Sequence, residues 1–191
     1  ARSIFSRKRE AVSTLVPLGQ VPTFWAERDP TFPAYSHGDL TVSRALFEAR
    51  CNRRARALAA YGIGQNDRVI MQMPNGVEFF ETTFALWKIG ATPVAVAGNS
   101  PDADLRNYID LITPRAMIGA PPLGSGATQI PADLAVDPLL SAEPLPECVP
   151  EFWRINMSGG STGRPKAIVD RTPARLDPLQ PMLCQKLDGV M

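Results

Sequence analysis

The chain has 191 residues, of which 45% are hydrophobic and 20% are charged, and its formal net charge is +1. This balance allows a sizeable hydrophobic core in about one domain. A net charge so close to zero gives no electrostatic footprint for nucleic acid, and no apolar run is long enough to cross a membrane. We therefore expect a soluble protein with no nucleic-acid partner and no membrane span.

The few cysteines and the single histidine limit the choice of compartment and of metal site. Cys51, Cys148 and Cys184 are odd in number and far apart, which indicates reduced thiols in a cytoplasmic protein. They do not form the pattern of a disulfide framework or a zinc site. His37 is the single histidine, so a metal site with two histidine ligands is excluded. It lies in a stretch typical of a turn. We expect no metal held by protein side chains alone.

The first sixty residues combine a basic start with a long helix. Residues 1–20 contain Arg7-Lys8-Arg9 and are predicted to be an irregular lead-in segment. A helix is predicted over residues 42–60, with Thr41 as its N-cap and Gly62 as its stop. Apolar residues at helical spacing predict a packing stripe, and four arginines predict a solvated face. The stripe comprises Leu46, Ala49, Ala55, Leu58 and Ala59, and the arginines are Arg50, Arg53, Arg54 and Arg56.

Strand and helix patterns then alternate. Strands are predicted over residues 68–73, 92–97 and 115–119, and helices over 77–89 and from Ser100-Pro101 onward, with Ser100 as the N-cap. The aromatic residues of the 77–89 helix share one face and are predicted to lie in the core: Phe80, Phe84 and Trp87. Alternation of this kind predicts an α/β fold with a parallel sheet and crossover connections.

The last third of the chain opens with a long connection and continues with a hairpin. Residues 120–151 contain seven prolines and are predicted to be a surface connection. Two strand-like runs follow, over residues 153–157 and 167–169. The segment between them, 158–166, reads Ser-Gly-Gly-Ser-Thr-Gly-Arg-Pro-Lys.

Residues 158–166 have the composition of a phosphate-binding loop. Glycine allows backbone N–H groups to approach an anion closely, and successive free N–H groups form a concave nest. Hydroxyls add donors, and Lys166 adds a compact positive charge that can reach a terminal phosphate. The predicted phosphate contacts are Ser158, Gly159, Gly160, Ser161, Thr162, Gly163 and Lys166.

Two better-known glycine-rich motifs are excluded here. A Walker A loop needs Gly-Lys followed by Ser or Thr, and Gly-Lys occurs nowhere in the chain. Neither Gly62-Ile63-Gly64 nor Gly124-Ser125-Gly126 is followed by the third glycine of a dinucleotide fingerprint. A flexible hairpin tip of small residues remains the alternative interpretation of residues 158–166.

The order of residues in this loop closely resembles the phosphate loop of adenylate-forming enzymes. These enzymes include acyl-CoA synthetases, adenylation domains and luciferases, and their usual loop is Thr-Ser-Gly-Ser/Thr-Thr-Gly-x-Pro-Lys. Two upstream segments are similar to further blocks of the family, the first running from Leu40-Thr41 to Val69 and the second from Met73 to Ala91. The chain departs from the family pattern at Val42, at Gly159 and at Ala167.

The resemblance implies an enzyme that joins a carboxylic acid to ATP, releases pyrophosphate and passes the acyl group to a thiol. ATP, Mg²⁺ and coenzyme A are the implied cofactors, and a carboxylic acid and a thiol acceptor are the implied partners. By position, Ser161, Thr162, Gly163 and Lys166 are the implied phosphate contacts. Lys166 is given the catalytic role of stabilising the charge of the departing pyrophosphate.

The length suggests how the chain is organised. Family members are more than twice as long, so we expect an N-terminal fragment that is inactive alone, with a homo-oligomer among its expected states. Its parts would be the lead-in over 1–20, an α/β subdomain over 21–170 and the start of the next element over 171–191. Two alternatives stay open: an adenylation domain that serves a carrier protein, and a non-catalytic α/β phosphate- or nucleotide-binding module.

Overall fold

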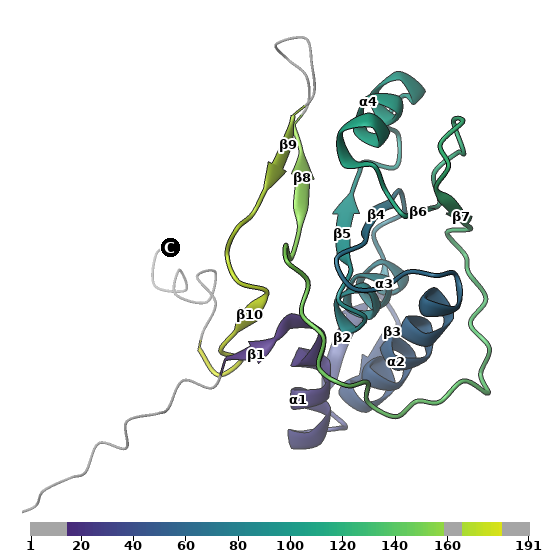
Figure 1. Cartoon of the computed structure of the whole chain (residues 1–191). Helices are drawn as coiled ribbons and strands as arrows, with labels where there is room; N and C mark the ends of the chain where they lie inside the picture. Colours follow the sequence, from purple (N-terminus) through teal and green to yellow (C-terminus); the bar gives the residue numbers. More distant parts are fainter. Residues whose placement is uncertain (1–14, 159–165, 181–191) are drawn as a thin grey trace, which may run out of the picture.

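The computed structural model describes residues 15–158 and 166–180. Its centre is a four-stranded parallel sheet in the order β5-β4-β6-β7 (Figure 1), which confirms the predicted α/β class. The strands of this sheet are β4 (Arg68–Met71), β5 (Thr92–Ala95), β6 (Ala116–Ile118) and β7 (Thr128–Ile130).

Helices cover both faces of this sheet. One face packs against α2 (Arg44–Ala60) and α3 (Val77–Lys88), and the other against α4 (Asp102–Ile112). Side chains of β4 alternate accordingly, because successive residues of a strand point to opposite faces. Val69 and Met71 pack with α2 and α3, whereas Ile70 packs with α4.

Smaller pairs of strands surround this core. The antiparallel hairpin of β2 (Pro33–His37) and β3 (Leu40–Ser43) turns at Gly38, which has φ +55°. The second hairpin joins β8 (Ile155–Met157) to β9 (Ala167–Val169), and β8 contacts β5 (Figure 1). His37 is the exposed last residue of β2. No helix of the described residues is long and apolar enough to span a membrane.

The start of the chain takes part in the fold from Val16 onward, where an irregular lead-in was predicted. Strand β1 (Val16–Pro17) pairs antiparallel with β10 (Arg175–Leu176), and helix η1 (Leu18–Gln20) leads into α1 (Val21–Arg28). Leu18 is buried, which gives this segment a packing role that its composition does not show.

The predicted surface connection over residues 120–151 contains a strand. β7 extends the parallel sheet beside β6, and Ile130 is 3% exposed. The prediction missed β7 because only three residues pair, and prolines surround them.

Both predicted helix starts were wrong in their capping residue. Thr41 lies in β3, and the Ser43 hydroxyl instead accepts a hydrogen bond from the Leu46 N–H at 3.3 Å. Helix α4 starts at Asp102 with Pro101 in the N-cap position, and no side chain caps it. Ser100 therefore lies one residue too early for the predicted role.

The predicted packing stripe of α2 was only partly right. Ala55 and Leu58 are fully buried, but Leu46 is 42% exposed. Phe47 and Cys51 occupy the buried face instead. Phe47, Cys51 and Ala55 follow one another along the helix at intervals of about one turn. Burial raises the pKa of the Cys51 thiol well above its usual value, which favours the neutral thiol over the nucleophilic thiolate.

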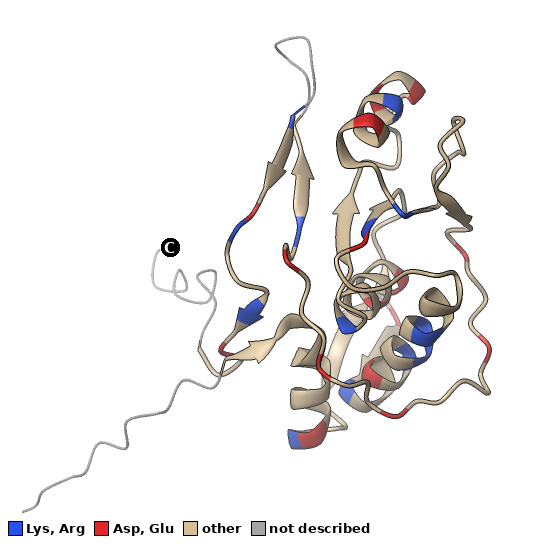
Figure 2. Cartoon of the chain, viewed as in Figure 1, with Lys and Arg blue, Asp and Glu red and all other residues tan. Residues whose placement is uncertain are grey.

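The four arginines of α2 that were predicted to form a solvated face, Arg50, Arg53, Arg54 and Arg56, do not form one. Arg50 and Arg54 pair with Glu81 of α3 at 3.3 and 3.5 Å, and Arg54 is only 8% exposed. Burial raises the pKa of Glu81, with Arg54 opposing the shift. Arg53 and Arg56 donate to main-chain carbonyls of the segment that follows β7, at Leu140, Ser141 and Glu143. Figure 2 shows charges of both signs along α2.

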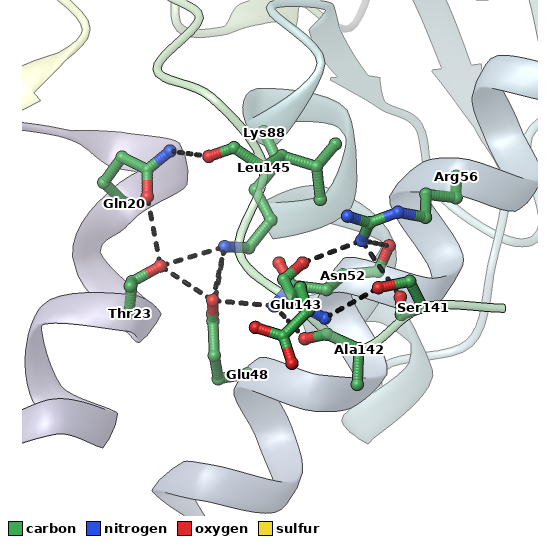
Figure 3. A network of polar contacts seen from close by, with 10 residues as sticks. All are labelled: Gln20, Thr23, Glu48, Asn52, Arg56, Lys88, Ser141, Ala142, Glu143 and Leu145. Carbon is green, nitrogen blue, oxygen red and sulfur yellow. Dashed lines mark hydrogen bonds and ion pairs between the residues drawn. The ribbon is translucent and has the colours of Figure 1, made fainter.

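A buried polar network joins α1, α2, α3 and that same segment (Figure 3). The Lys88 ammonium lies 2.9 Å from a carboxylate oxygen of Glu48 and is completely buried. Glu48 also accepts hydrogen bonds from Thr23 at 2.7 Å and from Asn52 at 2.9 Å. Asn52 further donates to the Ala142 carbonyl at 2.7 Å. The network fixes three helices and a long connection to one another.

Candidate functional site

The β8–β9 hairpin places the base of the predicted phosphate loop, Ser158 and Lys166, beside the central sheet. Ile155 is buried in the core together with Ile70, Val94 and residues of α4, and Met157 and Ala167 pack against the same cluster. The loop end of the hairpin therefore lies close to α4, which follows the carboxyl end of β5. Ligands of parallel α/β sheets bind outside the carboxyl ends of the strands, and this end of the hairpin lies at that edge.

The two residues at the base of the loop bind each other. The Ser158 N–H donates to the Lys166 carbonyl at 2.9 Å, and the Lys166 N–H donates to the Ser158 hydroxyl oxygen at 3.0 Å. These bonds continue the ladder of β8 and β9 by one pair, and they fix where the loop leaves and rejoins the hairpin. The Lys166 side chain is exposed. The other predicted contacts lie outside the described residues: Gly159, Gly160, Ser161, Thr162 and Gly163.

A second set of polar contacts fixes the opposite end of the hairpin. The Asp170 carboxylate accepts the Thr172 N–H at 3.0 Å and pairs with the Arg154 guanidinium at 3.2 Å. The hydrogen bonds from Thr172, together with Arg154, lower the pKa of Asp170 to about 2. The Arg154 guanidinium also lies over the Trp153 ring, 4.1 Å from its centroid.

Hydrogen bonds from the core anchor the chain just before β8. The Trp87 indole N–H donates to the Trp153 carbonyl at 2.7 Å, and the Thr92 hydroxyl donates to the Phe152 carbonyl at 2.6 Å. Trp87 is half-buried and also meets the Phe84 ring edge to face at 5.1 Å, so it is a positioning residue as well as a packing one. Its hydrogen-bond partner is 66 residues away in the chain, so the sequence pattern contained no signal for this contact. Phe80, which was also predicted to lie in the core, is instead 44% exposed.

A cavity of about 460 Å³ opens where β4 and β7 end. Because the strands of the sheet are parallel, this cavity lies at the same edge as the carboxyl end of β5. No motif in the sequence predicted this cavity. It is lined by Arg54, Met73, Pro74, Asn75, Gly76, Glu78, Ala132, Asp133 and Leu134.

Comparison with known families matches residues 23–174 to the family described as AMP-binding enzyme. The chain belongs to this family. The match includes the β8–β9 hairpin and the whole of segment 158–166, and it confirms the predicted adenylate-forming relationship.

Relatives of this AMP-binding chain include enzymes with different activities in their names. Pyochelin synthase PchD of Pseudomonas aeruginosa is 31% identical over 170 residues, which cover 76% of this chain and 31% of that protein. The long-chain-fatty-acid–CoA ligase FadD13 of Mycobacterium tuberculosis is 31% identical over 149 residues, which cover 69% of this chain and 30% of that protein. This chain therefore spans about a third of the length of these two relatives.

Solved structures show the same fold. The N-terminal domain of FACL13 from Mycobacterium tuberculosis is 25% identical, with a TM-score of 0.70, and the match covers 81% of this chain and 44% of that one. MbtA of Mycobacterium smegmatis is 24% identical, with a TM-score of 0.71, over 83% of this chain and 34% of that one. The sheet, its helices and the following hairpin are thus the N-terminal architecture of adenylate-forming enzymes.

Proposed function

We propose that this AMP-binding chain provides the phosphate-binding hairpin of an ATP-dependent ligase that activates a carboxylic acid. The observation that supports this best is the closed base of the loop, where Ser158 and Lys166 bind each other next to the carboxyl end of β5. Such a base holds the two ends of a glycine-rich loop together, so that its N–H groups can converge on an anion. Membership of the AMP-binding family supports an enzyme rather than a non-catalytic binding module.

In the proposed reaction, a carboxylate oxygen attacks the α-phosphorus of ATP, and the bond from that phosphorus to the bridging oxygen breaks. The products are an acyl adenylate and pyrophosphate, on which negative charge builds as it leaves. The Lys166 ammonium and the loop N–H groups would stabilise that charge. Ser158, Gly159, Gly160, Ser161, Thr162 and Gly163 complete the proposed contacts. Bound Mg²⁺ would add positive charge on the phosphates.

Replacing Lys166 tests this role in the native protein. Lys166→Ala removes a charge that the backbone cannot replace, so kcat for adenylation should fall about tenfold to a thousandfold. Thioester formation from preformed acyl adenylate should be nearly unchanged, because that half-reaction involves no pyrophosphate. Both half-reactions are measured on the same preparation.

Arg171→Ala is the matched control for Lys166→Ala. It removes one exposed positive charge five residues further along the chain and should leave both half-reactions near the wild-type rate. Equal losses in the two half-reactions of Lys166→Ala would assign Lys166 to the fold. No loss in either half-reaction would exclude the proposed role.

The finer proposal concerns the thiol acceptor. We propose coenzyme A, as in the printed name of FadD13. A carrier protein is the second candidate, because one relative is named a salicyl-S-ArCP synthetase and another a fatty acid–[acyl-carrier-protein] ligase. Supplying the native protein with acyl adenylate and either coenzyme A or a phosphopantetheinylated carrier protein distinguishes them by which thioester forms.

The size of the native protein tests whether this chain acts within a longer enzyme. We propose that it does, since it covers only about 31% of its relative PchD. Intact mass is measured on protein purified from its source, together with ATP–pyrophosphate exchange. A mass well above 20.7 kDa with exchange activity supports the proposal, and a mass of 20.7 kDa without exchange supports a binding module.

A further inference from the structure

An aromatic pocket of about 350 Å³ lies away from the phosphate-binding hairpin. It lies between α1, β2, α2 and α3, and no residue of β8 or β9 contributes to it. In Figure 1 the β8–β9 hairpin points to the top of the view, whereas α1 lies at the bottom. The pocket is lined by Val21, Pro22, Trp25, Pro33, Ala34, Tyr35, Arg44, Phe47, Phe80 and Phe84.

The walls of the aromatic pocket are preformed by ring–ring contacts. Phe47 and Phe84 meet edge to face with centroids 5.7 Å apart, and the rings of Tyr35 and Phe80 lie 5.9 Å apart. Phe80 is nevertheless 44% exposed at the edge of the pocket. Large apolar side chains left open around a concavity of this size are typical of a ligand site.

Arg44 is the one charged residue in the lining of this pocket. Its guanidinium carbon lies 4.5 Å from the centroids of both the Trp25 and Phe32 rings, and this double contact orients the planar group. Among the described residues, its charged partner is Asp29 at 3.7 Å, which is longer than a good hydrogen bond. The Arg44 side chain lines the pocket and is 19% exposed, so its guanidinium is largely shielded from water.

From this arrangement we infer that the aromatic pocket binds a small monocarboxylate with an aromatic body. The rings of the pocket would stack on the apolar part, and the guanidinium would form a bidentate pair with the carboxylate. A neutral aromatic would leave the Arg44 guanidinium with only its long contact to Asp29. An aliphatic dianion would meet a single cation among apolar walls. The site is separate from the hairpin, so the inference does not depend on the proposed ligase activity.

The test uses 2-naphthoate as the probe and the Trp25 indole N–H as the reporter. Titration of the ¹⁵N-tryptophan-labelled chain should move the Trp25 indole signal, assigned by its loss in Trp25→Phe. Arg44→Met should weaken 2-naphthoate binding about tenfold to a hundredfold, the usual effect of losing a charge-assisted hydrogen-bonded pair. Arg106→Met, which removes an exposed arginine on α4, is the matched control and should bind as wild type does.

Two further measurements separate lost recognition from lost structure. The neutral isostere 2-naphthylmethanol should bind wild type and Arg44→Met equally, which shows that the pocket still forms. Ala34→Trp adds a bulky ring from an exposed position in the lining and should abolish binding of both probes. The inference is overturned if 2-naphthoate causes no shift of the Trp25 signal, if Arg44→Met binds it as tightly as wild type, or if Ala34→Trp leaves its binding intact.

Discussion

Several charged side chains in this protein form their hydrogen bonds and ion pairs with residues that are distant in the sequence. Arg56 donates to a carbonyl 87 residues away, and Lys88 pairs with Glu48 across 40 residues. A helical pattern predicts which side chains share a face, but not what will cover that face. The arginines of α2 therefore looked like a solvated surface in the sequence, and only the packed segment after β7 gave them partners.

The low pKa of Asp170 predicts how the hairpin responds to acid. Its folded value of about 2 lies below the usual 3.8, so its contribution to stability is present above pH 3.8 and is lost as the pH falls through 2. In Asp170→Asn this contribution is absent at every pH. The difference in Tm between wild type and Asp170→Asn should therefore be largest at neutral pH and shrink between pH 4 and pH 2 in thermal melts. A difference that stays constant over this range would contradict the assignment.

Because Lys88 and Glu48 form a buried ion pair, the effects of substituting them on the free energy of unfolding should be strongly non-additive. Lys88→Met leaves a buried carboxylate without its cation, and Glu48→Leu leaves a buried ammonium without its anion. Each should lower the free energy of unfolding by about 3–5 kcal/mol, because an uncompensated charge stays buried. The double variant should recover part of that loss, as measured by urea unfolding of all four proteins. Exposed Glu78→Ala serves as the control and should change stability by less than about 0.5 kcal/mol.

At the scale of elements, the sequence pattern predicted helices α2, α3 and α4 and the strands of the central sheet other than β7, together with β8 and β9. It did not predict α1, the β2–β3 hairpin or the strands β1, β7 and β10. Helices α2 and α3 lie within two residues of the predicted bounds, because each buries a continuous periodic face. β1, β7 and β10 have two or three residues each and a proline within or close to them, so no strand-like run of apolar residues marks them. Their formation depends on a neighbouring strand that already has free hydrogen-bonding groups.

Helix η1 packs closely on α3, and a substitution at Gly19 tests how much this contact stabilises the protein. A Cβ at Gly19 would lie 2.7 Å from the Lys88 backbone nitrogen and 2.8 Å from Trp87 and Lys88 backbone carbons. Gly19→Ala should therefore push η1 from α3 and destabilise the protein by about 1–3 kcal/mol in urea unfolding. Gly64→Ala is the matched control, since nothing lies within 4 Å of its added Cβ, and its effect should stay within about 0.5 kcal/mol. Equal effects of the two substitutions would show that this contact is not tight.

At the scale of the whole molecule, the sequence by itself determined the parallel α/β class and the family. The class follows from alternating strand and helix periods, because an element must bury its apolar face against the next one. The family follows from the contiguous residues 158–166, whose order is independent of folding. Four features could be seen only in the tertiary structure: the aromatic pocket, the β1–β10 pair, the Lys88–Glu48 network and the anchoring of the hairpin by Trp87 and Thr92. Each of these brings together residues that are far apart in the chain, and the free energy of such contacts depends on burial and geometry that only the packed molecule creates.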